Sequence, residues 1–149
     1  TDMKHSWQDQ IIHSIKGLSN AKIVRYGAYH EDTYIDAPKN LNGNYEVVGD
    51  RGLYVIGQLS GIDGYLPAIS SALVAARSII GQQQGRIVDP LPTFTMIGAL
   101  GNYVSTKKEK KYEPMIPLFE MLSSKLDDHQ AQLLKSLDYL KQIVKKEKL

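Results

Sequence analysis

The segment from Leu53 to Tyr65 constrains the fold of this chain more than any other stretch. An apolar run leads directly into a glycine-rich loop, in the order Leu53-Tyr54-Val55-Ile56 and then Gly57-Gln58-Leu59-Ser60-Gly61-Ile62-Asp63-Gly64-Tyr65. Consecutive apolar residues predict a strand that is covered on both faces, and such strands lie in the middle of a sheet. Residues 57–65 are called the glycine loop below.

The glycine loop is predicted to connect this strand to a helix. From Tyr65 to Ile80, apolar residues recur at helical spacing, and Gly81 then supplies a stop. A strand that passes through a loop into a helix start gathers free backbone N–H groups and the positive helix end at one point. That point suits an anionic or electron-rich ligand group. Such loops also occur as plain tight connections, and the local pattern alone favours the plain connection.

Shorter elements are predicted on the N-terminal side of this segment. Apolar residues at helical spacing predict an amphipathic helix over Trp7–Ile15. The β-branched and aromatic residues that are typical of short strands occur at Ala21–Tyr26, Thr33–Ile35 and Tyr45–Val48. The segment Asn40–Asn44 has the composition of a turn, because Asn and Gly tolerate positive φ.

The C-terminal side is predicted to be mainly helical. A helix is expected over Thr93–Val104, where Gly98 and Gly101 indicate close helix packing rather than close approach to a ligand. Ser124 and Asp127 resemble a capping box that starts a final helix with apolar residues to Val144. We expect the apolar stripe of this final helix to dock on the core of the same chain. The predicted fold class is α/β, with one segment over 1–149: a sheet and glycine-loop region at 1–90, and a mainly helical portion at 91–149.

Composition excludes several classes of site. The 149 residues include no cysteine, which excludes a disulfide, a zinc-thiolate site and a cysteine nucleophile within the chain. The formal net charge is only +2, so the chain is not basic enough overall for its charge alone to indicate a nucleic-acid-binding protein. No apolar run is long enough to span a bilayer, and no secretory signal is present, so no membrane association is expected and a cytoplasmic location is the default.

Two polar clusters are weaker candidates for function. His30, Glu31 and Asp32 are adjacent in a predicted loop, but adjacent side chains diverge, so a solvated loop is favoured and no metal site is predicted. The second cluster is a lysine run that could meet RNA phosphates, with Tyr103 and Tyr112 available to stack on bases. A solvated loop is slightly favoured for this run also, which comprises Lys107, Lys108, Lys110 and Lys111.

Three segments in order resemble one enzyme family. Arg25–Pro38 is similar to R-Y-G-V-M-H-R-N-T-F-I-N-S-P, Leu53–Tyr65 to L-F-F-A-G-Q-I-T-G-V-E-G-Y, and Thr95–Val104 to T-A-L-G-A-L-x-x-Y-I. Glu113-Pro114-Met115 then stands where that family has Q-P-M. These are the patterns of the C-terminal third of the folate- and FAD-dependent uracil methyltransferases called TrmFO, relatives of the GidA/MnmG tRNA-modifying flavoproteins. The glycine loop is shared with GidA/MnmG, and the other two segments select the methyltransferase branch.

The resemblance implies an enzyme that methylates C5 of a uridine in tRNA or rRNA. The family takes its carbon from methylenetetrahydrofolate and its reducing equivalents from NAD(P)H through FAD. The chain would then be the C-terminal part of an FAD-binding, Rossmann-like domain, and its partners would be the RNA and the missing N-terminal half. By the match, the flavin would be lined by Gly57, Gln58, Gly61, Asp63, Gly64 and Tyr65. His30 and Thr33 fall on the family's histidine and threonine, near the flavin or folate.

Departures from the family pattern keep other functions open. Glu31-Asp32 replaces the family's Arg-Asn, Asp63 replaces its Glu, and the N-x-N-F-G-L pattern after Met115 is lacking. The G-x-G-x-x-G fingerprint and the catalytic cysteines are outside this chain, so no catalytic residue is assigned and the isolated chain is expected to be inactive. A non-catalytic RNA-binding or scaffold module, or a GidA/MnmG-type wobble-uridine protein, is the alternative. Without its N-terminal half the chain would expose an apolar strand edge, so a homo-oligomer is also expected.

Overall fold

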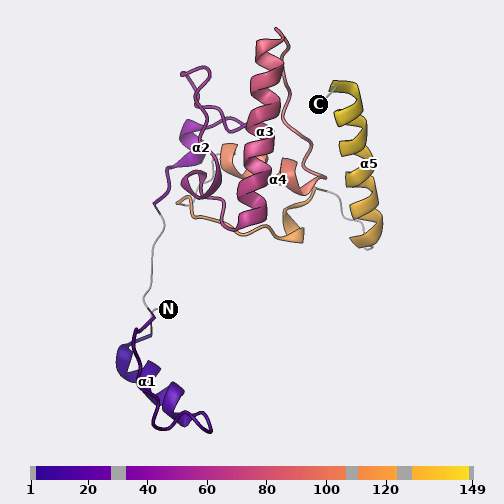
Figure 1. Ribbon diagram of the computed structural model, residues 1–149. Helices are drawn as coiled ribbons and strands as arrows, with labels where there is room; N and C mark the ends of the chain where they lie inside the picture. The colour runs from indigo at the N-terminus through magenta and orange to yellow at the C-terminus, as the bar shows by residue number, and fades with distance from the viewer. Residues whose placement is uncertain (1–2, 28–32, 107–110, 124–128, 148–149) are drawn as a thin grey trace. The chain divides into compact units, whose positions relative to one another are not determined.

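The computed structural model describes residues 3–27, 33–106, 111–123 and 129–147, and the chain divides into two compact units (Figure 1). The first unit, Thr1–Asp32, contains helix α1 (His5–Ser14), which buries no residue. Polar contacts organise this unit: Gln8 exchanges two hydrogen bonds with the backbone of Gly27, at 2.8 and 2.9 Å. The predicted helix at 7–15 is confirmed. The strand predicted at 21–26 is wrong, because side chains rather than a backbone ladder connect this segment to α1.

The second unit, Thr33–Leu149, is built around the long helix α3 (Figure 1). In its described residues the elements are α2 (Ala37–Asn40), the 3₁₀ turn η1 (Gly57–Ser60), α3 (Tyr65–Gln83), α4 (Met96–Ser105), the 3₁₀ turn η2 (Phe119–Met121) and α5 (His129–Glu147). Helix α4 packs against both α2 and α3. The helices predicted from Tyr65 and over 93–104 are therefore confirmed, with small differences at their ends.

The predicted sheet is wrong for the part of the chain that the structure describes. Backbone pairing there is limited to isolated bridges, which join Leu41 to Val47, Glu46 to Tyr54 and Ile62 to Met115. The segments 45–48 and 53–55 do lie antiparallel, with bonds of 2.8 Å from Val47 N to Leu53 O and 3.0 Å from Val55 N to Tyr45 O. The turn between them is short and Tyr45 has a φ of 66°, so no regular ladder develops.

The apolar run at 53–56 is correspondingly not a central strand. Leu53 is 49% exposed and Ile56 is 40% exposed, whereas a strand covered on both faces would bury both. The residues predicted as a strand at 33–35 also form none, although Ile35 N donates to Leu59 O at 3.0 Å. The described residues are mostly helical, and a Rossmann-like arrangement is not seen in them.

The core of the second unit lies where α2, α3 and α4 meet, and includes Ala37, Leu41, Tyr45, Ile62, Val74, Leu91, Leu100, Val104 and Tyr112. Both glycines of α4 serve close packing, as predicted. A Cβ atom at Gly98 would strike the backbone oxygens of Leu91 and Pro92, and one at Gly101 would lie 2.5 Å from Gly43 O. Thr95 caps α4, accepting a hydrogen bond from Gly98 N at 3.1 Å.

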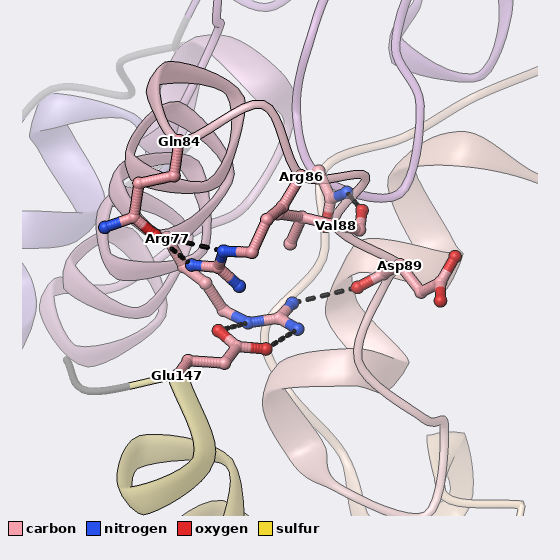
Figure 2. A network of polar contacts seen from close by, with 7 residues as sticks. Arg77, Gln84, Arg86, Val88, Asp89 and Glu147 are labelled. Atoms are coloured by element: carbon pink, nitrogen blue, oxygen red, sulfur yellow. Dashed lines mark hydrogen bonds and ion pairs between the residues drawn. The ribbon is translucent and has the colours of Figure 1, made fainter.

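Helix α5 runs alongside α3 and is fixed at both ends (Figure 1). Near its start, Gln132 Nε2 donates to Phe94 O, and in the middle of the helix Ser136 Oγ donates to the same oxygen at 3.0 Å and the Tyr139 ring meets the edge of Phe94 at 5.2 Å. At its end, Glu147 pairs with Arg77 of α3 (Figure 2). Tyr139 and Leu140 pack against the core, whereas Leu133, Leu137 and Val144 of the predicted stripe are 56%, 41% and 50% exposed, so the stripe docks on its own chain only in part. The predicted capping box at 124–127 lies outside the described residues.

None of the helices in the described ranges is both long enough and apolar enough to cross a bilayer.

Candidate ligand site at the start of helix α3

The glycine loop forms a compact turn that delivers the chain into α3. Residues Gly57–Ser60 make the 3₁₀ turn η1, and Gly61 follows in the left-handed region at φ 82°. Gly64 stands at the N-cap of α3 with φ 101°, a conformation that a side chain would strain. The loop is therefore a tight connection and, at the same time, places the free N-terminus of a 19-residue helix at its exit.

Contacts from distant parts of the chain hold the inner side of the loop. Gly57 N donates to Ser71 Oγ at 2.9 Å, and Ser60 Oγ donates to Gly57 O at 2.7 Å. Tyr112 Oη donates to Ser60 O at 2.6 Å, and the ring of Tyr112 fills the space where a Cβ atom of Gly61 would stand. Burial raises the pKa of Tyr112, so this hydroxyl stays a donor through the neutral range.

A parallel bridge fixes the second half of the loop. Met115 N donates to Gly61 O at 3.0 Å, and Asp63 N donates to Met115 O at 3.1 Å. Ile62, between them, is completely buried. Sequence reasoning did not assign Ser71, Tyr112 or Met115 to the site. Tyr112 was considered only as a base-stacking residue, and no local spacing signals a partner so far along the chain.

The outer side of the loop is open. Gln58 and Gly64 are exposed, Asp63 is half-buried, and Gln58 Nε2 lies 3.5 Å from Asp63 Oδ1. Tyr65 is 92% exposed. No side chain caps α3 in the described part of the chain, and the first N–H groups of a helix have no intrahelical acceptor. The outer side therefore offers backbone donors and the positive end of the α3 dipole to a ligand.

The structure brings together all six predicted residues of the glycine loop, but divides them into two roles. Gly57 and Gly61 are buried and shape the turn, whereas Gln58, Gly64 and Tyr65 face outward. Thr33 is exposed and lies two residues from Ile35, whose N–H binds the loop at Leu59 O.

The remaining predicted residues contribute little to this geometry. His30, Glu31 and Asp32 lie outside the described residues, as do Lys107, Lys108 and Lys110, and Lys111 is described and exposed. Within the described ranges, no group of three or more His, Asp or Glu side chains is placed to hold a metal ion.

Comparison with known proteins identifies the family. The family model described as "Glucose inhibited division protein A" matches residues 1–86, more than half of the chain. A protein of Lactobacillus johnsonii named methylenetetrahydrofolate–tRNA-(uracil-5-)-methyltransferase TrmFO is 38% identical over 127 residues, which are 85% of this chain and 29% of that protein. Proteins of the same name are 35% identical in Staphylococcus aureus (97% of this chain, 35% of that protein) and 36% identical in Staphylococcus epidermidis (94% and 34%).

The chain thus spans about a third of the length of the curated relatives that it matches. Their similarity covers most of the chain, and the family match includes the whole glycine loop and all of α3. On this evidence, the chain belongs to the glucose inhibited division protein A family.

Proposed function

We propose that this chain is the C-terminal FAD-binding part of a flavoprotein that methylates C5 of uridine in tRNA, or in rRNA. The carbon donor would be methylenetetrahydrofolate and the reductant NAD(P)H, and the place of action the cytoplasm. The observation that carries the proposal is the similarity to methyltransferases of that name over 85–97% of the chain. The open start of α3 in the same region supports it.

The residues of the glycine loop fit a flavin. A flavin ring system carries carbonyl oxygens that need donors and a flat apolar surface that needs contact. The N–H groups of Tyr65 and Leu66 at the uncapped start of α3 would meet the first need. The next residue, Pro67, has no backbone N–H, so Tyr65 and Leu66 are the residues that supply the donors at this helix start. When bound, the flavin would supply the redox chemistry; the loop's own part would be to orient and polarise it.

The rest of a longer protein would complete the site. Tyr65, Leu66, Ile69 and Leu73 form an exposed apolar stripe on α3, which a chain of this length leaves uncovered. The absence of cysteine means that covalent catalysis would come from outside the chain. We therefore expect the isolated 149 residues to be inactive and prone to self-association through the stripe.

A chimera tests the proposal. This chain would replace the matching third of the Lactobacillus johnsonii relative, and the purified chimera would be examined for flavin absorption and for methyl transfer to C5 of uridine in unmodified tRNA. We expect both. A folded chimera that binds no flavin when FAD is supplied would refute the proposal.

Two glycines provide a matched pair of variants in this chimera. Gly64→Ala and Gly49→Ala each place a side chain at positive φ, 101° and 91°, at a backbone strain of about 1–3 kcal/mol, and the added Cβ would meet Pro67 at 3.3 Å in the first variant and no atom within 4 Å in the second. Only Gly64 lies at the start of α3. Flavin content should fall in Gly64→Ala and stay unchanged in Gly49→Ala. Equal loss in both would mean that strain, not the site, determines binding.

The alternative of an RNA-binding or scaffold module without catalysis rests on exposed basic residues. Lys111 is exposed, and Lys145 and Lys146 stand exposed in the last turn of α5. This function predicts that the chain alone binds tRNA with steep salt dependence and that the chimera lacks flavin. A GidA/MnmG-type function predicts flavin in the chimera but modification at the wobble uridine.

A further inference from the structure

Two arginines lie close together near the C-terminal end of α3, the end opposite to the glycine loop (Figure 2). Arg77 belongs to α3, and Arg86 follows three residues after the helix ends. Arg77 donates to both carboxylate oxygens of Glu147 and to Asp89 O. Arg86 is half-buried, and among the described residues its guanidinium donates to the amide oxygen of Gln84 and meets no carboxylate. Arg77 and Arg86 are called the arginine pair below.

Positive charge exceeds negative charge around the arginine pair. Glu147 supplies the carboxylate there. Its pKa is lowered by the hydrogen bonds from Arg77 and, in addition, by the charges of Arg77, Arg86 and Lys146. The Asp89 carboxylate points away from both guanidiniums (Figure 2) and forms no ion pair in the described part of the chain. Three cations therefore share one carboxylate, which leaves a net positive charge that an anion of higher charge would neutralise.

The bound carboxylate indicates which chemical class the arginine pair accepts. Two N–H donors of Arg77 meet the two oxygens of one oxyanion, a geometry that carboxylate and phosphate share. A phosphate group adds a third oxygen and a second negative charge, which Glu147 lacks. Arg86 has donors for that oxygen, because Gln84 takes only its Nε and Nη2 and its Nη1 makes no hydrogen bond among the described residues.

The end of α5 is held loosely enough to be displaced. Gln132 is the only residue that α5 buries, and Val144 in its last turn is 50% exposed. A cavity of about 430 Å³ lies between α3 and α5, with Arg77, Ile80 and Val144 among its lining residues. Side chains that face a cavity lose their van der Waals contacts on that side. The last turn of α5 therefore depends on the polar contact of Glu147 with Arg77.

We infer that the arginine pair is a phosphate site that Glu147 occupies as an internal substitute, and that a bound phosphate group displaces Glu147 and releases the end of α5. The ligand class is a phosphate oxyanion, either free or part of a nucleic acid. Arg77 lies about 18 Å along α3 from Tyr65, at about 1.5 Å per residue. The site is therefore separate from the flavin position, and it does not depend on the proposed function.

Titration calorimetry of the full 149-residue chain with pyrophosphate tests the site. The unchanged chain should bind weakly, because Glu147 competes. Glu147→Gln removes the competing charge and should bind pyrophosphate about tenfold more tightly or better. Arg86→Gln retains the pair between Arg77 and Glu147, so it should fold normally and lose the binding. Arg51→Gln removes the same charge at an exposed arginine elsewhere and should change the affinity less than about twofold.

Hydrogen exchange measures the release of α5. Amides in its last turn should exchange faster in saturating pyrophosphate, and they should exchange about equally fast in Glu147→Gln without ligand. Amides of α4 should not change, and their protection shows that each variant is folded. Three results would each overturn the proposal: equal affinity in Glu147→Gln and the unchanged chain, equal losses in Arg86→Gln and Arg51→Gln, or unchanged exchange of the last turn under saturation.

A short single-stranded RNA, titrated in parallel, identifies the source of the phosphate. Tighter binding of the RNA, with the same dependence on Arg86 and Glu147, would assign the site to a nucleic acid backbone. Tighter binding of pyrophosphate would assign it to a small phosphate-bearing molecule. Binding of RNA that is equal in Arg86→Gln and the unchanged chain, together with no binding of pyrophosphate, would show that the arginine pair is not a phosphate site.

Discussion

Arg77 of α3 and Glu147 of α5 form a two-point ion pair across 70 positions of sequence (Figure 2). Arg77 Nε donates to Glu147 Oε2 at 2.8 Å, and Nη2 donates to Oε1 at 2.6 Å. The third nitrogen, Nη1, donates to Asp89 O at 2.8 Å. One guanidinium therefore joins α3, the connector before α4 and the end of α5, and both side chains of the pair are only 10% exposed.

Breaking this pair should release the end of α5. We expect Arg77→Met or Glu147→Gln to lower the free energy of unfolding by about 1–3 kcal/mol, because each leaves a largely buried charge without its partner. The Lys39–Asp36 pair, with side chains 73% and 43% exposed, is the control, and Lys39→Met should cost less than about 1 kcal/mol. Urea denaturation measures both. Equal effects at the two pairs would contradict the structural role of Arg77.

The same pair should make stability depend on pH in the acid range. Hydrogen bonds from Arg77 lower the pKa of Glu147 below its ordinary 4.5. The folded state then holds this proton less tightly than the unfolded state, so the contribution is complete above pH 4.5 and is lost as pH falls through the lowered folded value. Denaturation at a series of pH values should show a smaller acid-range slope in Glu147→Gln. An unchanged slope would assign the acid sensitivity to other carboxylates.

Two buried tyrosines should respond in opposite directions to loss of the hydroxyl. Tyr45 is fully buried and its Oη lacks a partner among the described residues, so Tyr45→Phe should stabilise the chain by roughly 1 kcal/mol. Tyr112 Oη donates to Ser60 O, so Tyr112→Phe should destabilise it by about 1 kcal/mol. Thermal unfolding of the two variants in parallel measures the contrast. Destabilisation by Tyr45→Phe would show that its hydroxyl has a partner in solution.

Both tyrosines should also limit stability in alkali. Burial is the main cause that raises the pKa of Tyr45 and of Tyr112 above the ordinary 10.0. The folded state then retains protons that the unfolded state releases, so stability is full below pH 10 and declines above it, by up to about 1.4 kcal/mol per pH unit for each group. Tyr45→Phe should reduce this decline, as measured by urea denaturation at several alkaline pH values. Tyr54→Phe, at a half-buried tyrosine, serves as the control.

Gly101→Ala should be among the most damaging single changes in α4. The added Cβ would lie 2.5 Å from Gly43 O, a backbone atom that cannot rotate away, so helix and turn must separate. We expect a loss of roughly 1–3 kcal/mol by urea denaturation, although alanine favours helix over glycine. Asn102→Ala, at the exposed neighbouring position, should be nearly neutral. A stabilised Gly101→Ala would mean that α4 does not approach Gly43 this closely.

Local patterns predicted the helices well because helical periodicity is a property of consecutive residues. The spacing of apolar side chains after Tyr65 gave α3, and Gly98 and Gly101 were interpreted correctly as packing positions. The prediction of a strand at Leu53–Ile56 is wrong because strand formation depends on residues elsewhere in the chain and not on consecutive residues alone. An apolar run predicts burial in a sheet only if neighbouring strands exist to pair with it, and the described residues provide single bridges instead.

The candidate site was predictable only on its ligand-facing side. The glycine spacing and the match to TrmFO identified the loop, but its supports come from Ser71, Tyr112 and Met115, which no spacing rule connects to it. The buried Oε1 of Gln132, which has no hydrogen-bond partner among the described residues, could not be predicted either, since a glutamine within an amphipathic helix is expected at the surface.

Two contacts of the glycine loop come from residues far along the chain: the bridge between Ile62 and Met115, and the hydrogen bond from Tyr112 to Ser60 across 52 positions. These contacts set the order in which parts of the chain fold during synthesis. A nascent chain that has just completed α3 has the glycines of the loop but not the residues that hold them. The helix can form locally, whereas the loop acquires its shape only after Tyr112 and Met115 have left the ribosome. The glycine loop is therefore expected to take its folded shape late in biogenesis, and a premature stop before Tyr112 would remove the contacts that hold the loop while leaving every residue of the loop in place.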